Sequence, residues 1–175
     1  GYEAMTDQAT GGNNVVIGYQ AGFDMNGHQY NTAVGSYAMG LCNGGENSNT
    51  AIGYSAMKSV TGASQYNVSI GTTSLTGGTG AVNDCIAIGY TAMDGTGTIA
   101  ADDCIFIGTS AGGGAWSTAT STDNIGIGTN ALAGGLIGAL KNVAIGTNAM
   151  EDLTTGDSNT AVGYLAVSYT HLTLP

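Results

Sequence analysis

A glycine returns along this chain at nearly constant intervals, each time after a short apolar run. Ten glycines take part, spaced 17 to 20 residues apart: Gly1, Gly18, Gly35, Gly53, Gly71, Gly89, Gly108, Gly128, Gly146 and Gly163. A fixed period of this length indicates stacked copies of one small structural unit. The repeat includes nearly every residue, so it leaves little room for a catalytic site and argues against an enzyme.

The residues before each glycine predict a short strand. The position directly before it is always Ile or Val, namely Ile17, Val34, Ile52, Ile70, Ile88, Ile107, Ile127, Ile145 and Val162. Two positions earlier, every repeat has another β-branched residue, from Val15 to Thr160. Such residues favour strands, and side chains two positions apart share one face of a strand. No 3.6-residue period is sustained, so the sequence predicts an all-β fold.

The other face of each predicted strand carries mainly Ala, Ser and Gly. Strands that are buried on both faces are typical of parallel sheets, so we expect a parallel β-roll or β-solenoid of about nine coils. Apolar burial within one coil is small beside the entropy lost in ordering about 18 residues. We therefore expect several chains to associate, and we place their contact on the Ala/Ser/Gly face.

Asparagine occupies the position four before the glycine in seven of nine repeats: Asn14, Asn31, Asn49, Asn67, Asn124, Asn142 and Asn159. Stacked amides can hydrogen-bond along the array as a structural ladder. A polar binding face is the alternative. The other two repeats have Cys85 and Cys104, which are either disulfide-bonded or two buried thiols. Cys42 lies in a link and is expected to be unpaired.

Three acids, Asp84, Asp103 and Asp123, share one position in successive repeats. A divalent cation with oxygen ligands would relieve their repulsion, which makes them candidate metal ligands. A solvated column of acids is the alternative. Trp116, the only tryptophan, lies in a glycine-rich link. It is a candidate receptor contact, or else it covers the edge of a coil.

Two further columns are expected to pack at a seam between subunits. One consists of tyrosines that directly follow the glycine, and the other of methionines three positions later. They are Tyr2, Tyr19, Tyr54, Tyr90 and Tyr164, and Met5, Met39, Met57, Met93 and Met150.

The composition excludes several function classes. The formal net charge is −10, with two lysines and no arginine. Nucleic acid and anionic membrane surfaces are therefore unlikely partners. No apolar run reaches the ~20 residues of a membrane-spanning helix. His28 is the one histidine before the C-terminal tail and is expected to be a solvated turn residue, so no catalytic residue and no cofactor is predicted.

Both ends of the chain depart from whole repeats. The chain begins with the second half of a repeat, so we expect residues 1–166 to be a single repeat array taken from a longer protein. Residues 167–175 (VSYTHLTLP) break the pattern. This string looks like a translation of a transposon mosaic-end adapter, so we expect it to be foreign to the native protein. A genuine terminal tail is the alternative.

Residues 49–57 (NTAIGYSAM) and 142–150 (NVAIGTNAM) resemble the head repeats of YadA-like trimeric autotransporter adhesins. Similar repeats occur in bacteriophage tail fibres. The resemblance implies a left-handed β-roll, a homotrimer about one axis, and binding to a host surface glycan or matrix protein. The chain departs from the family in its longer interval and in its Tyr and Met columns. No ligand-binding residue carries over.

We therefore expect a non-enzymatic segment of a trimeric extracellular fibre, located on a bacterial surface or a phage virion tail. It would act in attachment, as an adhesin head, or as a spacer. The nearest alternative is the receptor-binding shaft of a phage tail fibre. An ice-binding β-solenoid would need a regular Thr face, but Val and Ile interrupt Thr32, Thr50 and Thr160. A carbohydrate-active β-helix enzyme would need clustered carboxylates in a cleft.

Overall fold

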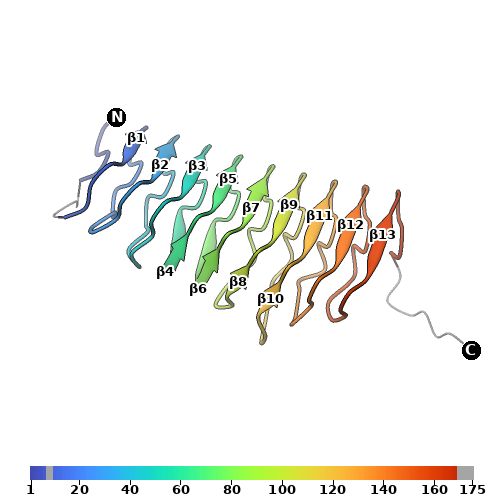
Figure 1. The fold of residues 1–175 in the computed structure, drawn as a ribbon. Helices are drawn as coiled ribbons and strands as arrows, with labels where there is room; N and C mark the ends of the chain where they lie inside the picture. Colours follow the sequence, from blue (N-terminus) through green and yellow to red (C-terminus); the bar gives the residue numbers. More distant parts are fainter. Residues whose placement is uncertain (7–9, 169–175) are drawn as a thin grey trace, which may run out of the picture.

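The computed structural model describes residues 1–6 and 10–168, and these form an elongated stack of coils without any helix (Figure 1). Each apolar run before a repeat glycine is a strand, and nine such strands form the longer sheet. In sheet order they are β1 (Val15–Ile17), β2 (Thr32–Val34), β3 (Thr50–Ile52), β5 (Val68–Ile70), β7 (Ile86–Ile88), β9 (Ile105–Ile107), β11 (Ile125–Ile127), β12 (Val143–Ile145) and β13 (Thr160–Val162).

All neighbouring strands of this sheet are parallel and in register. Ile52 lies opposite Ile70, and Ile70 lies opposite Ile88, so the residues before the glycines form a single file. The predicted all-β parallel β-solenoid is therefore confirmed, with nine rungs and about eight turns.

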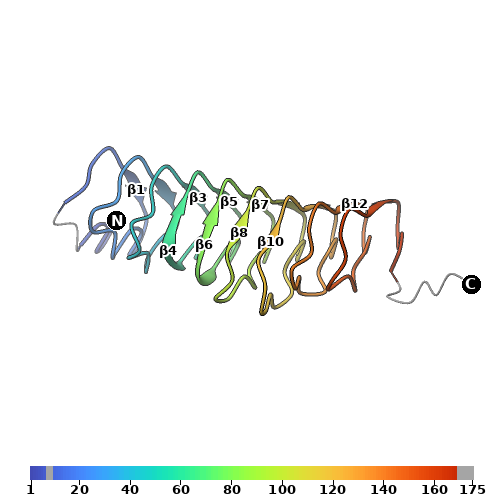
Figure 2. The same ribbon diagram turned by 60° about the horizontal axis from the view of Figure 1, so that its bottom comes forward.

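A second parallel sheet is confined to the middle coils. It contains β4 (Ser59–Gln65), β6 (Gly77–Asn83), β8 (Ala101–Asp102) and β10 (Ser121–Thr122). Figures 1 and 2 show these strands along a different side of the coils from the nine-stranded sheet. Residues 169–175, most of the segment that we expect to be foreign, lie outside the described residues.

Our association argument required the Ala/Ser/Gly face of the strands to lie at the surface of the chain. In the structure this face points inward, and the face that carries the β-branched residues points outward. The small residues at the strand centres, such as Ala33, Ala51 and Ala87, are fully buried inside the chain's own coils. The β-branched residues beside them point outward, with Ile17 58% exposed and Ile52 39% exposed. The prediction that the Ala/Ser/Gly face joins chains is therefore wrong. The interior of a coil is narrow, and larger side chains from the turns already occupy most of it.

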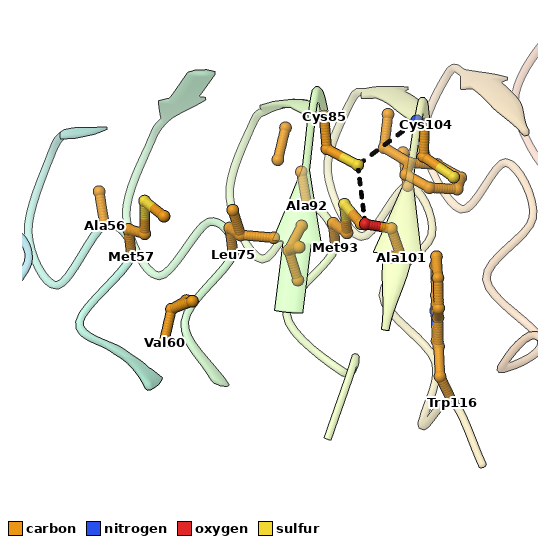
Figure 3. Close-up of a cluster of buried hydrophobic side chains, with 14 of the residues drawn as sticks. Ala56, Met57, Val60, Leu75, Cys85, Ala92, Met93, Ala101, Cys104 and Trp116 are labelled. Atoms are coloured by element: carbon orange, nitrogen blue, oxygen red, sulfur yellow. Dashed lines mark hydrogen bonds between the residues drawn. The ribbon is translucent and has the colours of Figure 1, made fainter. Parts of the chain in front are cut away.

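These larger side chains come from the turn after each glycine. Met39, Met57, Leu75, Met93, Leu132 and Met150 are fully buried, and Figure 3 shows three of them within the cluster. From Met39 onward, the methionine column therefore belongs to the core of one chain, and the expectation of a methionine seam between subunits is wrong there; Met5, in the incomplete first coil, is half-buried. Each long turn residue packs where the strand centre is small.

In one coil, the large and the small residue exchange places. Phe106 stands at the centre of β9, and Gly112 replaces the long residue of the following turn. A Cβ atom at Gly112 would lie 2.6 Å from Cδ1 of Phe106, closer than real Cβ contacts. In the first coil, a Cβ atom at Gly22 would lie 2.5 Å from Sδ of the buried Met25 and 3.3 Å from Cγ1 of Val16, so Met25 takes most of the space there. The interior volume of a coil is therefore shared between these two positions.

The repeat glycines lie where successive coils approach most closely. From Gly18 to Gly163, their φ angles lie between +131° and +140°, a range that other residues rarely adopt. A Cβ atom at Gly53 would lie 2.5 Å from the carbonyl oxygen of Gly71, and one at Gly108 would lie 2.5 Å from that of Gly128. The glycine period in the sequence is thus a direct consequence of the stacking.

Candidate functional site

The asparagine column forms a hydrogen-bonded ladder inside the coils. The Oδ1 atom of Asn31 accepts bonds from the backbone N–H and the side-chain amide of Asn49, at 2.9 and 3.3 Å. Nδ2 of Asn49 also donates to the carbonyl of Ser64 in the next coil at 2.9 Å. Asn67, Asn124 and Asn142 repeat this arrangement, and Asn14 and Asn159 extend it into the outer coils. Because the central amides are buried and paired, their role here is to fix the register of the coils.

Cys85 and Cys104 stand in the two rungs that lack asparagine, and both are free thiols. The Cys85 sulfur accepts the backbone N–H of Cys104 at 3.4 Å and donates to the carbonyl of Ala101 at 3.7 Å (Figure 3). It thereby continues the ladder with weaker bonds. A hydrogen bond with Cys104, and then burial, raise the pKa of Cys85 well above its ordinary value, so this group stays a thiol. Cys42 is also free and buried.

Trp116 folds inward and is only 4% exposed. Its indole nitrogen donates to the carbonyl of Gly112 at 3.0 Å, and its ring packs edge-on against Phe106 with centroids 5.9 Å apart. Of the two roles that we considered, the structure therefore supports the cover over the coil, and the receptor-contact hypothesis is wrong. The glycine-rich link lets the chain turn back so that the ring reaches the core.

The stacked acids Asp84, Asp103 and Asp123 lie exposed at a left-handed turn, with φ angles of +53°, +55° and +58°. Asp adopts this conformation more readily than most residues, which gives the column a conformational reason. Within residues 1–6 and 10–168, no three His, Cys, Asp or Glu side chains are grouped so that they could hold a metal ion. The geometry favours the solvated column over the candidate metal site.

His28 and Glu46 form a buried ionisable pair that the sequence analysis missed. Nε2 of His28 lies 3.1 Å from Oε2 of Glu46, and both side chains are fully buried, so the expectation of a solvated histidine is wrong. Nε2 also accepts the N–H of Gly45 at 3.2 Å, and Glu46 accepts that of Gly44 at 3.0 Å. Both residues stand three positions before a ladder asparagine, in successive coils. Their shared position in the repeat was the sequence signal that could have predicted this pair.

Burial lowers the pKa of His28 from 6.5 and raises that of Glu46 from 4.5, so each group favours its neutral form. In a Glu46→Gln variant, unfolded His28 binds protons more readily than folded His28. The free energy of unfolding should therefore fall as the pH drops below about 6.5.

In a His28→Gln variant, folded Glu46 binds its proton more tightly than unfolded Glu46. The contribution of this proton binding to the free energy of unfolding is complete below about pH 4.5 and is lost as the pH rises through the raised folded-state pKa of Glu46.

Urea titrations of both variants between about pH 4 and pH 8 check this expectation, with the unaltered chain as the reference for the other carboxylates. Relative to that reference, the two variants should change stability in opposite directions with pH. Parallel curves for the two variants would contradict the described burial of the pair.

A continuous apolar surface runs along the nine-stranded sheet, and we call it the β-branched face. It consists of the outward residues of the nine strands: Val15, Ile17, Thr32, Val34, Thr50, Ile52, Val68, Ile70, Ile86, Ile88, Ile105, Ile107, Ile125, Ile127, Val143, Ile145, Thr160 and Val162. None of them is buried and none is charged, although the chain has a formal net charge of −10. Exposed apolar surfaces of this extent mark interaction sites.

Exposed tyrosines directly follow the glycines of several coils, and the half-buried Tyr37 stands two positions after Gly35. In the first coils they contact one another: the ring centroids of Tyr2 and Tyr19 are 5.8 Å apart, those of Tyr19 and Tyr37 5.3 Å, and those of Tyr37 and Tyr54 6.0 Å. Tyr90 and Tyr164 are exposed in later coils. The tyrosine column therefore lies at the surface of the single chain, unlike the methionine column.

Comparison with known protein families finds no matching family model, and comparisons with curated proteins and with solved structures find no significant match. The fold and its surfaces therefore define the class of this protein: a β-solenoid repeat protein with an apolar sheet face. The described part of the chain has no helix with the length and hydrophobicity that crossing a membrane requires.

Proposed function

We propose that this chain is a non-enzymatic segment of a trimeric extracellular fibre, in which it acts as an attachment head or a spacer. The observation that carries the proposal is the β-branched face, which extends over all nine rungs and remains uncovered in the single chain. A rigid stack with one uniform apolar side is suited to lengthwise association with copies of itself. The repeat sequences that resemble adhesin heads favour three chains and a cell-surface location.

The β-branched face takes the place of the Ala/Ser/Gly face as the contact between chains. Ile and Val fill most of its positions, while Thr fills three of them, Thr32, Thr50 and Thr160. Such a surface gains more from burial against another chain than from contact with water or ice. Obligate homo-oligomers bury apolar surfaces of this kind, which resemble a core cut in half.

A charge on the β-branched face tests the proposal. Ile88→Glu would place a carboxylate in the contact from every chain, and burying an ion without a partner is strongly unfavourable. We expect the unaltered chain to elute as a trimer in size-exclusion chromatography with light scattering, and the variant to lose at least about tenfold in association affinity. Thr79→Glu, at an exposed position of β6, is the matched control and should stay trimeric. Equal masses for both variants would contradict the assignment of this face.

A further inference from the structure

A small pocket lies on the surface of the N-terminal coils. Its volume is about 240 Å³, and its lining residues are Gln20, Phe23, Tyr37, Gly40, Leu41 and Lys58. Two of these residues are aromatic, and Leu41 is 46% exposed, so the pocket offers an apolar wall that water reaches. A volume of this size suits a single small ring better than part of a protein surface or a long ligand.

Lys58 is the only charged residue in the lining. It is one of two lysines in a chain without arginine and with twelve acids. Its Nζ atom lies 4.6 Å from the centroid of the Tyr37 ring, which holds the ammonium group at the pocket. Within residues 1–6 and 10–168, no carboxylate lies within salt-bridge distance of Lys58, so no described acid neutralises it.

The remaining polar group of the pocket is the Gln20 side chain. Its Nε2 atom donates to Glu3 at 2.5 Å, which fixes the orientation of the amide and leaves Oε1 as an acceptor. The pocket therefore combines one cation, one carbonyl acceptor and two aromatic rings. Sugars with an acid group carry the complementary set: one carboxylate, several hydroxyl donors, and a C–H face that packs on an aromatic ring.

We propose that this pocket binds a carboxylated sugar unit of a glycan, with the carboxylate at Lys58 and the sugar ring against the aromatic wall. The proposal rests on the proposed attachment function and names a ligand class for it. One lysine matches one carboxylate, whereas phosphorylated ligands are usually held by several cations or by backbone N–H groups. The strongly acidic remainder of the chain excludes nucleic acid as the source of the anion.

The test is a set of NMR titrations of the full chain with tetragalacturonate, sialyllactose and a hyaluronan tetrasaccharide. The methyl ester of tetragalacturonate is the neutral counterpart. We expect at least one acidic sugar to bind, and its methyl ester or neutral analogue to bind at least about tenfold more weakly, because the charged pair is lost. Lys58→Met keeps the apolar stem and should weaken binding by a similar factor. Lys141→Met removes the other lysine, which is exposed, and should change nothing.

Three outcomes would overturn the pocket assignment: no binding of any of the three probes at millimolar concentration, equal binding of acid and ester, or unchanged binding by Lys58→Met. The mass of the assembly is measured in the same samples and should not change in Lys58→Met. A trimer that binds no acidic sugar overturns the pocket alone, whereas a monomer that binds one overturns the trimeric fibre alone.

Discussion

Gly108→Ala is expected to destabilise the fold by at least about 3 kcal/mol, a large fraction of the roughly 5–15 kcal/mol that stabilises a typical domain. The added Cβ atom would lie 2.5 Å from the carbonyl oxygen of Gly128, and the φ angle of +139° disfavours any side chain. The overlapping atom belongs to the backbone of the next coil, so no side-chain movement can relieve it. Urea denaturation followed by far-UV circular dichroism measures the loss.

Gly77→Ala is the matched control for this experiment. Its Cβ atom would meet only the carbonyl oxygen of Asp94, at an ordinary distance of 3.6 Å. We expect its stability to stay within about 1 kcal/mol of the unaltered chain. If Gly108→Ala were as stable as Gly77→Ala, the close approach of successive coils at the repeat glycines would not exist.

The second large effect concerns the volume that Phe106 and Gly112 share. Phe106→Ala should lower the free energy of unfolding by about 3–5 kcal/mol, because it opens a cavity in a core where the ring packs against Trp116. Adding Gly112→Met should restore at least half of that loss. The added methionine would occupy the place that Met93 has one coil earlier, where the backbone has a similar φ of +53°.

Gly112→Met on its own should destabilise the chain, because its side chain would overlap the Phe106 ring. The two substitutions are therefore expected to be strongly non-additive, and a double-mutant cycle in urea measures the coupling. Additive effects would contradict the exchange of large and small residues between the strand centre and the turn.

Most of the fold could be predicted from the spacing of residues along the sequence. The glycine period and the β-branched columns led to parallel strands in register, because both features come directly from the stacking of Gly53 on Gly71 and of Ile52 on Ile70. The direction of the strand faces was harder to predict, because both faces are apolar and alternation alone does not show which one points inward. The pairing of Phe106 with Gly112 was the sequence signal for the inner face.

The candidate sites were less predictable than the fold. His28 and Trp116 both lie in glycine-rich links that read as solvated turns, yet each link folds back and buries its large side chain. Lys58, Tyr37 and Gln20 belong to three successive coils, so their proximity depends on the turn geometry after each glycine. A contact between copies of the chain leaves no mark within a single copy except an uncovered surface, and the residues of the β-branched face are not buried in the single chain.

Sedimentation equilibrium of the unaltered chain at micromolar concentration tests the central claim most directly. If the β-branched face joins three chains, the folded species should have three times the chain mass of 17.3 kDa. A folded species with the mass of one chain, stable in that concentration range, would contradict the account.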